Sequence, residues 1–185
     1  MEKYLDLTNS EHYTLVKKLV EGIKRENINK ILDAGSGKTS LSILLDLFPS
    51  SKIDAIVFYG DLRKINSLSA TIVSNRYQLM EKDICKDNIS NSYDLILAHL
   101  LLGEAIKWGN TVADLLLSLI KINSKYLIVY DFKEDISINY NYLEKTFQEY
   151  YLIIKKEEIL KSEPQDFGNF IGKTYIAYLL ERKNS

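Results

Sequence analysis

The feature that most constrains the fold is a short apolar run that ends in an aspartate and is followed by two glycines one residue apart, Ile31-Leu32-Asp33-Ala34-Gly35-Ser36-Gly37. A segment with leucines on one side comes next, from Ser40 to Phe48, and Pro49 ends it. This order predicts a strand over residues 30–34, a tight turn and a helix. Such a unit is typical of the first strand and helix of an α/β sheet.

The rest of the chain alternates apolar runs with amphipathic segments. We expect helices at 9–26, 61–68, 111–122 and 142–150, and strands at 52–58, 77–80, 93–98, 125–130, 151–155 and 174–180. The alternation predicts a parallel sheet covered on both faces by helices. No long helix separates the last two strands, so we expect the final strand to run antiparallel. Residues 100–110 are expected to form a loop.

Length and composition narrow the possible classes of protein. The 185 residues suit one domain, with 1–28 as an N-terminal helical cap region and 29–185 as the core. The formal charge of −1 does not support a nucleic-acid partner, although a local basic patch leaves one possible. We expect no membrane span, because no run reaches the roughly 20 apolar residues that one needs. A single cysteine, Cys85, excludes an intrachain disulfide and favours the reducing cytoplasm.

The glycine turn is expected to bind a ligand. Ligands of parallel sheets bind outside the carboxyl ends of the strands, and glycines allow the backbone to approach them closely. The alternative is a tight turn without a ligand. The string Gly37-Lys38-Thr39 suggests a phosphate loop, but that loop needs a glycine five positions earlier, where this chain has Leu32.

The dinucleotide fingerprint Gly-x-Gly-x-x-Gly fits only in part. Gly35 and Gly37 match it, but Ser40 stands at the third position. Asp33 would also lie near a pyrophosphate, and two like charges repel each other. A cationic ligand therefore suits this turn better.

Three segments resemble the motifs of the class I S-adenosylmethionine-dependent methyltransferases. Residues 32–37 resemble the first motif, Asp/Glu-x-Gly-x-Gly-x-Gly, and Lys82-Asp83-Ile84 resembles the acidic position that meets the adenine amino group. Residues 93–101 resemble the fourth motif. The resemblance extends over about residues 10–180 by strand order. It implies a three-layer α-β-α sandwich with a doubly wound, seven-stranded, mostly parallel sheet and an antiparallel last strand.

The resemblance also implies a cofactor and the residues that bind it. The cofactor is S-adenosyl-L-methionine, and the expected binding residues are Asp33, Gly35, Ser36, Gly37, Asp61, Asp83, Ile84 and Ala98. The chain departs from the family pattern at two places. Thr39 replaces the third glycine of the motif, and apolar residues stand near Val57-Phe58, where the family has a carboxylate that holds the ribose. The first carboxylate after them is Asp61, which serves equally well as a helix N-cap.

His99 is the candidate catalytic residue. It follows the fourth strand, and its ordinary pKa suits a general base if the acceptor must lose a proton. A structural histidine is the alternative. Glu104 and Asp131 also follow strands, but we expect both to be surface carboxylates, and we expect His12 to lie on a solvated surface.

No metal site is expected, because the chain has only two histidines and one cysteine. Trp108 is expected to shield the loop after the fourth strand rather than to cap a pocket.

The sequence therefore favours methyl transfer from S-adenosylmethionine to a small molecule. Two alternatives stay open at this stage. One is a catalytically inactive Rossmann-like module that binds a partner or regulates it, and the other is an NAD(P)-binding oxidoreductase.

Overall fold

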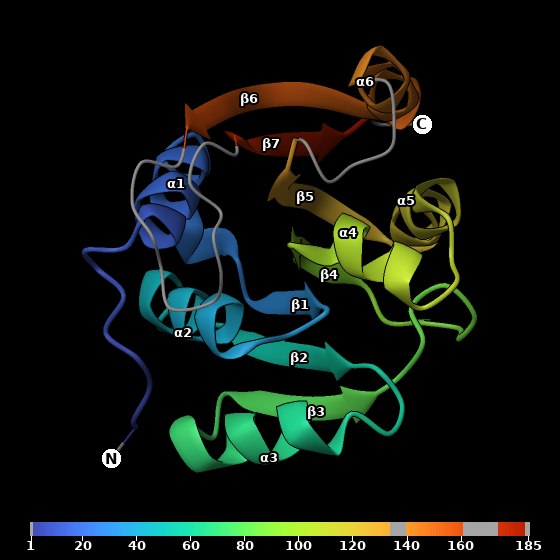
Figure 1. The fold of residues 1–185 in the computed structure, drawn as a ribbon. Helices are drawn as coiled ribbons and strands as arrows, with labels where there is room; N and C mark the ends of the chain where they lie inside the picture. The colour runs from blue at the N-terminus through green and yellow to red at the C-terminus, as the bar shows by residue number, and fades with distance from the viewer. Residues whose placement is uncertain (1, 134–139, 161–173, 184–185) are drawn as a thin grey trace.

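The computed structural model describes residues 2–133, 140–160 and 174–183, and it contains one seven-stranded sheet with helices on both faces (Figure 1). The strands are β1 (Lys30–Ala34), β2 (Lys52–Val57), β3 (Tyr77–Glu81), β4 (Tyr93–His99), β5 (Ser124–Phe132), β6 (Tyr151–Leu160) and β7 (Thr174–Arg182). The helices are α1 (Glu11–Val20), α2 (Lys38–Leu47), α3 (Leu62–Thr71), α4 (Leu101–Lys107), α5 (Val112–Lys121) and α6 (Tyr140–Tyr150), with one 3₁₀ turn at Arg25–Asn27.

The strand order is β3-β2-β1-β4-β5-β7-β6. Strands β1 to β5 are all parallel to one another, and β7 is antiparallel to both β5 and β6. The predicted sheet and its antiparallel last strand are therefore confirmed. The chain builds outward from β1 to β3 and then crosses to β4 on the other side of β1. That reversal is the place where open α/β sheets form a crevice.

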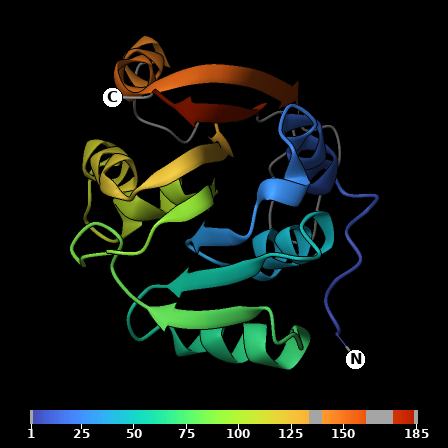
Figure 2. The same cartoon turned by 180° about the vertical axis from the view of Figure 1, so that it is seen from behind.

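Two hydrophobic clusters cover the two faces of the sheet. Because successive strand residues point to opposite faces, Ile31 packs with helices α1 to α3 while its neighbour Leu32 packs with α4 to α6. Strand β4 repeats the pattern, with Leu95 on the first face and Ile96 on the second. The view from behind shows the same two layers of helices around the sheet (Figure 2). The central strands are thus buried on both sides, as their continuous apolar runs predict.

Helix α4 occupies part of the segment that we expected to be a loop. Its local sequence offers no N-cap, since Leu100 precedes it in a left-handed conformation with φ of 52°. The cap comes from β5 instead: the buried Asp131 carboxylate accepts hydrogen bonds from Leu102 N at 2.7 Å and Gly103 N at 3.3 Å. The expectation that Asp131 is a surface carboxylate was therefore wrong. It satisfies backbone donors that would otherwise be unpaired.

Helix α1 is shorter than predicted but begins where the sequence places its cap. The Ser10 hydroxyl accepts a hydrogen bond from Tyr13 N at 3.1 Å, which is the N-cap geometry that serine favours. The helix then packs against β6 and β7. In the described parts of the chain, every helix is too short or too polar to cross a lipid bilayer.

Candidate functional site

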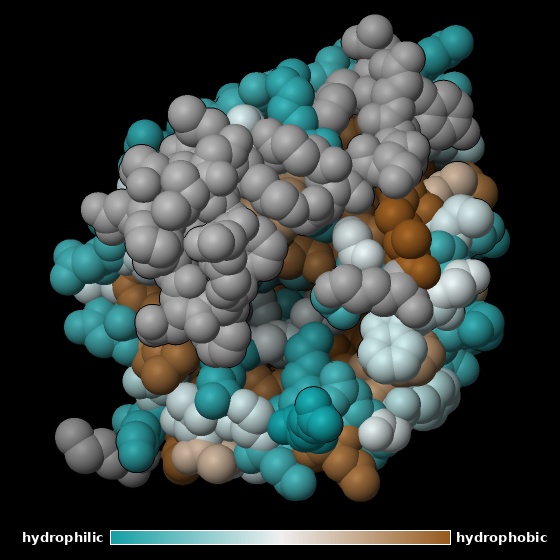
Figure 3. All heavy atoms as spheres, viewed as in Figure 1, coloured by the Kyte–Doolittle hydropathy of each residue, from teal (hydrophilic) through white to brown (hydrophobic). Residues whose placement is uncertain are grey.

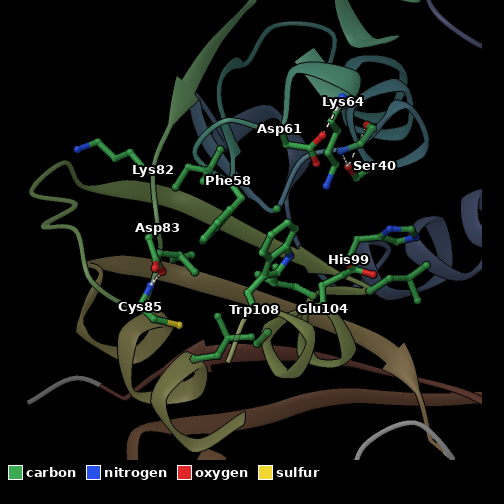
Figure 4. Close-up of a pocket in the computed structure, with 18 of the residues that line it drawn as sticks. Ser40, Phe58, Asp61, Lys64, Lys82, Asp83, Cys85, His99, Glu104 and Trp108 are labelled. Carbon is green, nitrogen blue, oxygen red and sulfur yellow. Dashed lines mark hydrogen bonds between the residues drawn. The ribbon is translucent and has the colours of Figure 1, made fainter. Parts of the chain in front are cut away.

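A cavity opens at the carboxyl ends of β1 to β4, beside the reversal of strand order (Figure 4). Its walls are the turn after β1 with the first residues of α2, the segments that follow β2 and β3, and the end of β4 with α4. Six of the predicted site residues line it: Gly35, Gly37, Asp61, Asp83, Ile84 and His99. The space-filling view shows this face hollowed near its centre, with hydrophilic and hydrophobic residues side by side around the hollow (Figure 3).

The other three predicted residues lie behind the cavity wall. Asp33, Ser36 and Ala98 are buried, and none of them lines the cavity. They support the turn and the end of β4 rather than face the open space.

The two glycines of the turn have different structural roles. Gly35 has φ of +100°, and a Cβ atom there would lie 2.5 Å from Leu101 Cδ1. Gly37 is extended, with φ of −140°, and a Cβ atom there would meet only Lys64 Cε, at 3.9 Å. The backbone therefore requires glycine at position 35, whereas glycine at position 37 keeps space open in the cavity.

The buried Asp33 carboxylate stabilises this turn through hydrogen bonds. Its Oδ2 atom accepts hydrogen bonds from Ser36 Oγ at 2.6 Å and Ser40 Oγ at 2.8 Å, and Ser40 Oγ in turn accepts one from Gly37 N at 3.0 Å. Within the described residues, Asp33 Oδ1 has no hydrogen-bond partner. Burial raises the pKa of Asp33 to about 6, against the two serine hydrogen bonds that lower it.

Asp61 does what an N-cap does and also faces the cavity. Its carboxylate accepts a hydrogen bond from Lys64 N at 3.0 Å, and this contact caps the N-terminus of α3.

The Lys64 side chain lines the cavity and forms no ion pair among the described residues. Its positive charge lowers the pKa of both Asp33 and His99, so the ammonium lies near the glycine turn and near the end of β4. Sequence reasoning missed Lys64, although its place three residues after a helix N-cap could have indicated it.

His99 forms a buried pair with His12. The His99 Nε2 and His12 Nδ1 atoms lie 3.1 Å apart, and Tyr130 Oη lies 2.8 Å from the same His12 nitrogen. The expectation that His12 is solvated was wrong, because α1 packs its first turn over β4 and β5 and leaves His12 only 7% exposed. Figure 4 shows the His99 ring turned away from Trp108.

The His99 pKa lies well below its ordinary value. Burial is the main cause, and the neighbouring His12 and the positive charge of Lys64 lower it further. His99 is therefore a neutral imidazole at neutral pH, able to accept a proton but held by a hydrogen bond at Nε2.

Asp83 places a carboxylate at the opposite end of the cavity. It follows β3 and is buried, with Oδ1 accepting a hydrogen bond from Cys85 N at 2.9 Å and Oδ2 paired with Lys86 Nζ at 2.9 Å. Ile84 beside it packs against the cluster that α4 and α5 share. This end of the cavity therefore combines one anionic group with an apolar wall.

Two aromatic rings that the sequence did not assign to the site meet across the cavity. Phe58 follows β2 and Trp108 ends α4, and their ring centroids lie 4.5 Å apart with an interplanar angle of 23°. Both line the cavity, so Trp108 does more than shield the segment after β4. Phe58 stands at the end of β2, where the sequence shows an apolar residue in place of the expected carboxylate.

Comparisons with known proteins relate the fold to one group of enzymes. No family model matches the sequence, and no curated protein matches it. Solved structures do match. The N-methyltransferase NodS from Bradyrhizobium japonicum WM9, in complex with S-adenosyl-L-homocysteine, superimposes with a TM-score of 0.69 at 10% identity, over 95% of this chain and 87% of that one.

Two further structures match in the same way. Residues 942–1257 of the StiE O-MT give a TM-score of 0.66 at 15% identity, over 91% of this chain and 73% of theirs. The 16S rRNA methylase ArmA gives 0.62 at 15% identity, over 95% of this chain and 84% of that one. Identities this low show the fold and not the activity. The chain has the fold of the class I S-adenosylmethionine-dependent methyltransferases.

Proposed function

We propose that this protein binds S-adenosyl-L-methionine and transfers its methyl group to an acceptor, most simply a small molecule. The observation that carries the proposal is the cavity at the carboxyl edge, where the Gly35–Gly37 turn and Asp83 lie at the ends of β1 and β3. The fold around it is one that NodS uses in a complex with S-adenosyl-L-homocysteine.

The residues of the cavity fit the chemistry of this cofactor. The side of Gly37 that a Cβ atom would occupy is open. The Lys64 ammonium and the first N–H groups of α2 supply positive charge for a carboxylate. Asp83 supplies an acceptor for an amino group, and Asp33, Ser36 and Ala98 support the wall that these groups share.

Methyl transfer asks little covalent chemistry of the protein. When bound, the cofactor supplies a methyl group already activated by a sulfonium. The protein then has to hold the acceptor atom in line with the methyl group and the sulfur, because correct orientation of the reactants raises the rate. Leu101 and Ala105, on α4, add apolar surface to the wall of the cavity.

We propose His99 as the base for an acceptor that must lose a proton. It is neutral, and its hydrogen bond to His12 fixes the ring at the end of β4. His99→Gln should lower turnover by roughly 10²–10⁴-fold, the usual contribution of general base catalysis. Transfer of labelled methyl to a small-molecule extract measures turnover, and calorimetry shows whether cofactor affinity is retained. Unchanged turnover would leave His99 a structural residue.

The binding proposal is tested by titration calorimetry with S-adenosylmethionine, S-adenosylhomocysteine, NAD(H) and NADP(H). We expect binding of the first two only. Gly37→Val should abolish that binding while the protein still melts within a few degrees of wild type, because the new side chain points into open space. Absence of S-adenosylhomocysteine binding at millimolar ligand contradicts the proposal. Binding of NAD(H) instead indicates an oxidoreductase, and binding without turnover on any acceptor indicates a regulatory module.

A further inference from the structure

Three buried polar side chains connect the cavity to α1. His99 lines the cavity at the end of β4, His12 lies in the first turn of α1, and Tyr130 lies in β5. The His12 Nδ1 atom is 3.1 Å from His99 Nε2 and 2.8 Å from Tyr130 Oη. Figure 4 shows His99 on the side of the cavity opposite to Asp83. The network of these three side chains therefore lies at the end of the cavity away from Asp83.

The hydrogen atoms of this network can be assigned by counting. A neutral ring nitrogen carries either one hydrogen or one lone pair, so His12 Nδ1 cannot donate to one partner and accept from the other. Tyr130 is fully buried, and burial raises its pKa well above the ordinary value, so the hydroxyl keeps its hydrogen. A buried donor is costly to leave unpaired. Tyr130 therefore donates to His12 Nδ1, and His12 carries its own hydrogen on Nε2.

The assignment of His12 determines that of His99. If His99 Nε2 carried a lone pair, two lone pairs would face each other across 3.1 Å. Neutral His99 therefore carries its hydrogen on Nε2 and shares the Nδ1 lone pair of His12 with Tyr130. The lone pair of His99 is left on Nδ1, because the bond made by one ring nitrogen fixes the state of the other. His99 thus takes up a proton at Nδ1.

The backbone of His99 completes the network. Burial lowers the pKa of His99 most strongly, His12 and Lys64 lower it further, and a hydrogen bond to the His99 backbone raises it. Because Nε2 is bonded to His12, the nitrogen that reaches the backbone is Nδ1. In the neutral ring a lone pair faces the backbone oxygen, whereas in the imidazolium an N–H group donates to it. All contacts of the ring are satisfied only when His99 carries both hydrogens.

We propose that His12 and Tyr130 are positioning residues for His99 in the proton-transfer step. They hold its hydrogen on Nε2, leave the Nδ1 lone pair for the proton of the acceptor, and stabilise the imidazolium that forms. This proposal rests on the proposed function, in which His99 is the base.

The proposed step balances in protons and electrons. The proton moves from the acceptor atom to His99 Nδ1, and the electron pair of the broken bond stays on the acceptor atom. That atom forms the new bond to the methyl carbon as the carbon leaves sulfur, which keeps the electron pair of its former bond. The imidazolium then returns the proton to water.

Nitrogen NMR tests the assigned hydrogens without cofactor or acceptor. The chain has two histidines, so protein labelled with nitrogen-15 in histidine gives four ring signals. At neutral pH we expect both rings to carry their hydrogen on Nε2. A hydrogen on Nδ1 of His99 in the wild-type protein would overturn the proposal.

Tyr130→Phe tests whether the network controls His99. Once the hydroxyl is removed, His12 can carry its hydrogen on Nδ1 and donate it to His99 Nε2. The His99 hydrogen should then move to Nδ1, and turnover should fall by roughly 10–100-fold, the usual loss when a partner that orients a metal-bound histidine is removed. Adding His12→Asn to this variant should return the hydrogen to Nε2 and recover most of the turnover, because an amide oxygen accepts at the position of Nδ1.

Tyr178→Phe is the matched control. Tyr178 is also buried, but on the opposite face of the sheet, where its hydroxyl donates to Glu144 Oε1 at 3.0 Å. This variant should leave the His99 hydrogen and the turnover unchanged. The double variant Tyr130→Phe/His99→Gln should be no slower than His99→Gln, because Tyr130 acts through His99.

Calorimetry with S-adenosylhomocysteine on the same proteins separates this proposal from the function on which it rests. If the ligand binds but Tyr130→Phe leaves the His99 hydrogen on Nε2, or leaves turnover unchanged, the positioning role is wrong and the proposed function stands. If the hydrogen moves as expected but the ligand does not bind, the network is as described, whereas the proposed function and the role of His12 and Tyr130 in that reaction are wrong.

Discussion

Gly35 and Gly37 differ in what the structure demands of them, and a matched pair of alanine variants measures the difference. Gly35→Ala places a side chain at φ of +100°, with its Cβ 2.5 Å from Leu101 Cδ1. The unfavourable backbone conformation costs about 1–3 kcal/mol. Displacing Leu101 costs roughly another 1–2 kcal/mol, as overpacking does in cores. The free energy of unfolding should therefore fall by about 2–5 kcal/mol.

Gly37→Ala should cost much less. Its φ of −140° suits any residue, and the nearest atom to the new Cβ is Lys64 Cε at 3.9 Å. The remaining cost is the weaker preference for alanine at an N-cap, about 1 kcal/mol or less.

Urea denaturation and thermal melting, both followed by circular dichroism without ligand, provide the measurement. For a chain of 185 residues, each kcal/mol lowers the melting temperature by roughly 2–4 °C. Gly35→Ala should thus melt about 4–20 °C below wild type, and Gly37→Ala less than about 4 °C below it. Equal losses in the two variants, or a Gly35→Ala protein that melts like wild type, would refute the assignment of the turn geometry to Gly35.

Three other perturbations test the elements around the site. As the pH falls from 7 to 5, His99→Gln should gain about 1–2 kcal/mol of stability relative to wild type, because below about pH 6.5 the unfolded wild-type chain takes up a proton at His99 that the folded protein, with its lowered His99 pKa, does not; urea titrations of both proteins at the two pH values measure the difference. Asp131→Ala should remove the cap of α4 at a cost of about 1–2 kcal/mol and increase amide exchange over that helix more than elsewhere. Arg182→Met should lower the free energy of unfolding by roughly 2–4 kcal/mol, because the Arg182 guanidinium donates hydrogen bonds to Ser124 O at 2.8 Å and Ile122 O at 2.7 Å; Arg182→Lys should recover part of the loss.

The sequence predicted those site residues whose positions depend on their neighbours along the chain. A strand, a glycine turn and a capped helix follow from neighbouring residues, so Gly35, Gly37 and Asp61 lie where the pattern places them. The parallel sheet follows from the alternation of strands with helices, whereas its seven strands were implied by the resemblance to the methyltransferase motifs. The resemblance pointed to Asp83 and the carboxyl end of the fourth strand pointed to His99, and both line the cavity.

The sequence failed where the cause is a contact between distant residues. Helix α4 depends on a cap from Asp131, 29 positions further along the chain from Leu102. His12 stands four and seven residues before the buried Val16 and Leu19, so the helical spacing places it on the apolar face of α1, but that spacing does not reveal that His99 of β4 meets it there. Trp108 meets Phe58 only when α4 is in place. In each case tertiary packing overrode the local pattern, which predicts element type better than element surroundings.

The two buried ionisable groups at the ends of β1 and β4 compensate for each other when the pH changes. Asp33 has a pKa of about 6 instead of 3.8, so the folded protein keeps a proton there that the unfolded chain releases between about pH 4 and pH 6. Stability therefore falls by about 3 kcal/mol as the pH rises through that interval. His99 acts with the opposite sign in the same interval, since its protonation favours the unfolded chain only as the pH falls.

Over the pH range in which both groups titrate, their contributions to the pH dependence of stability therefore have opposite signs. A protein that buries one protonated carboxyl group and one neutral imidazole in adjacent strands is thus less sensitive to mild acid than either group alone would make it. Asp33→Asn should uncover the His99 slope, His99→Gln should uncover the Asp33 slope, and the double variant should be flat again.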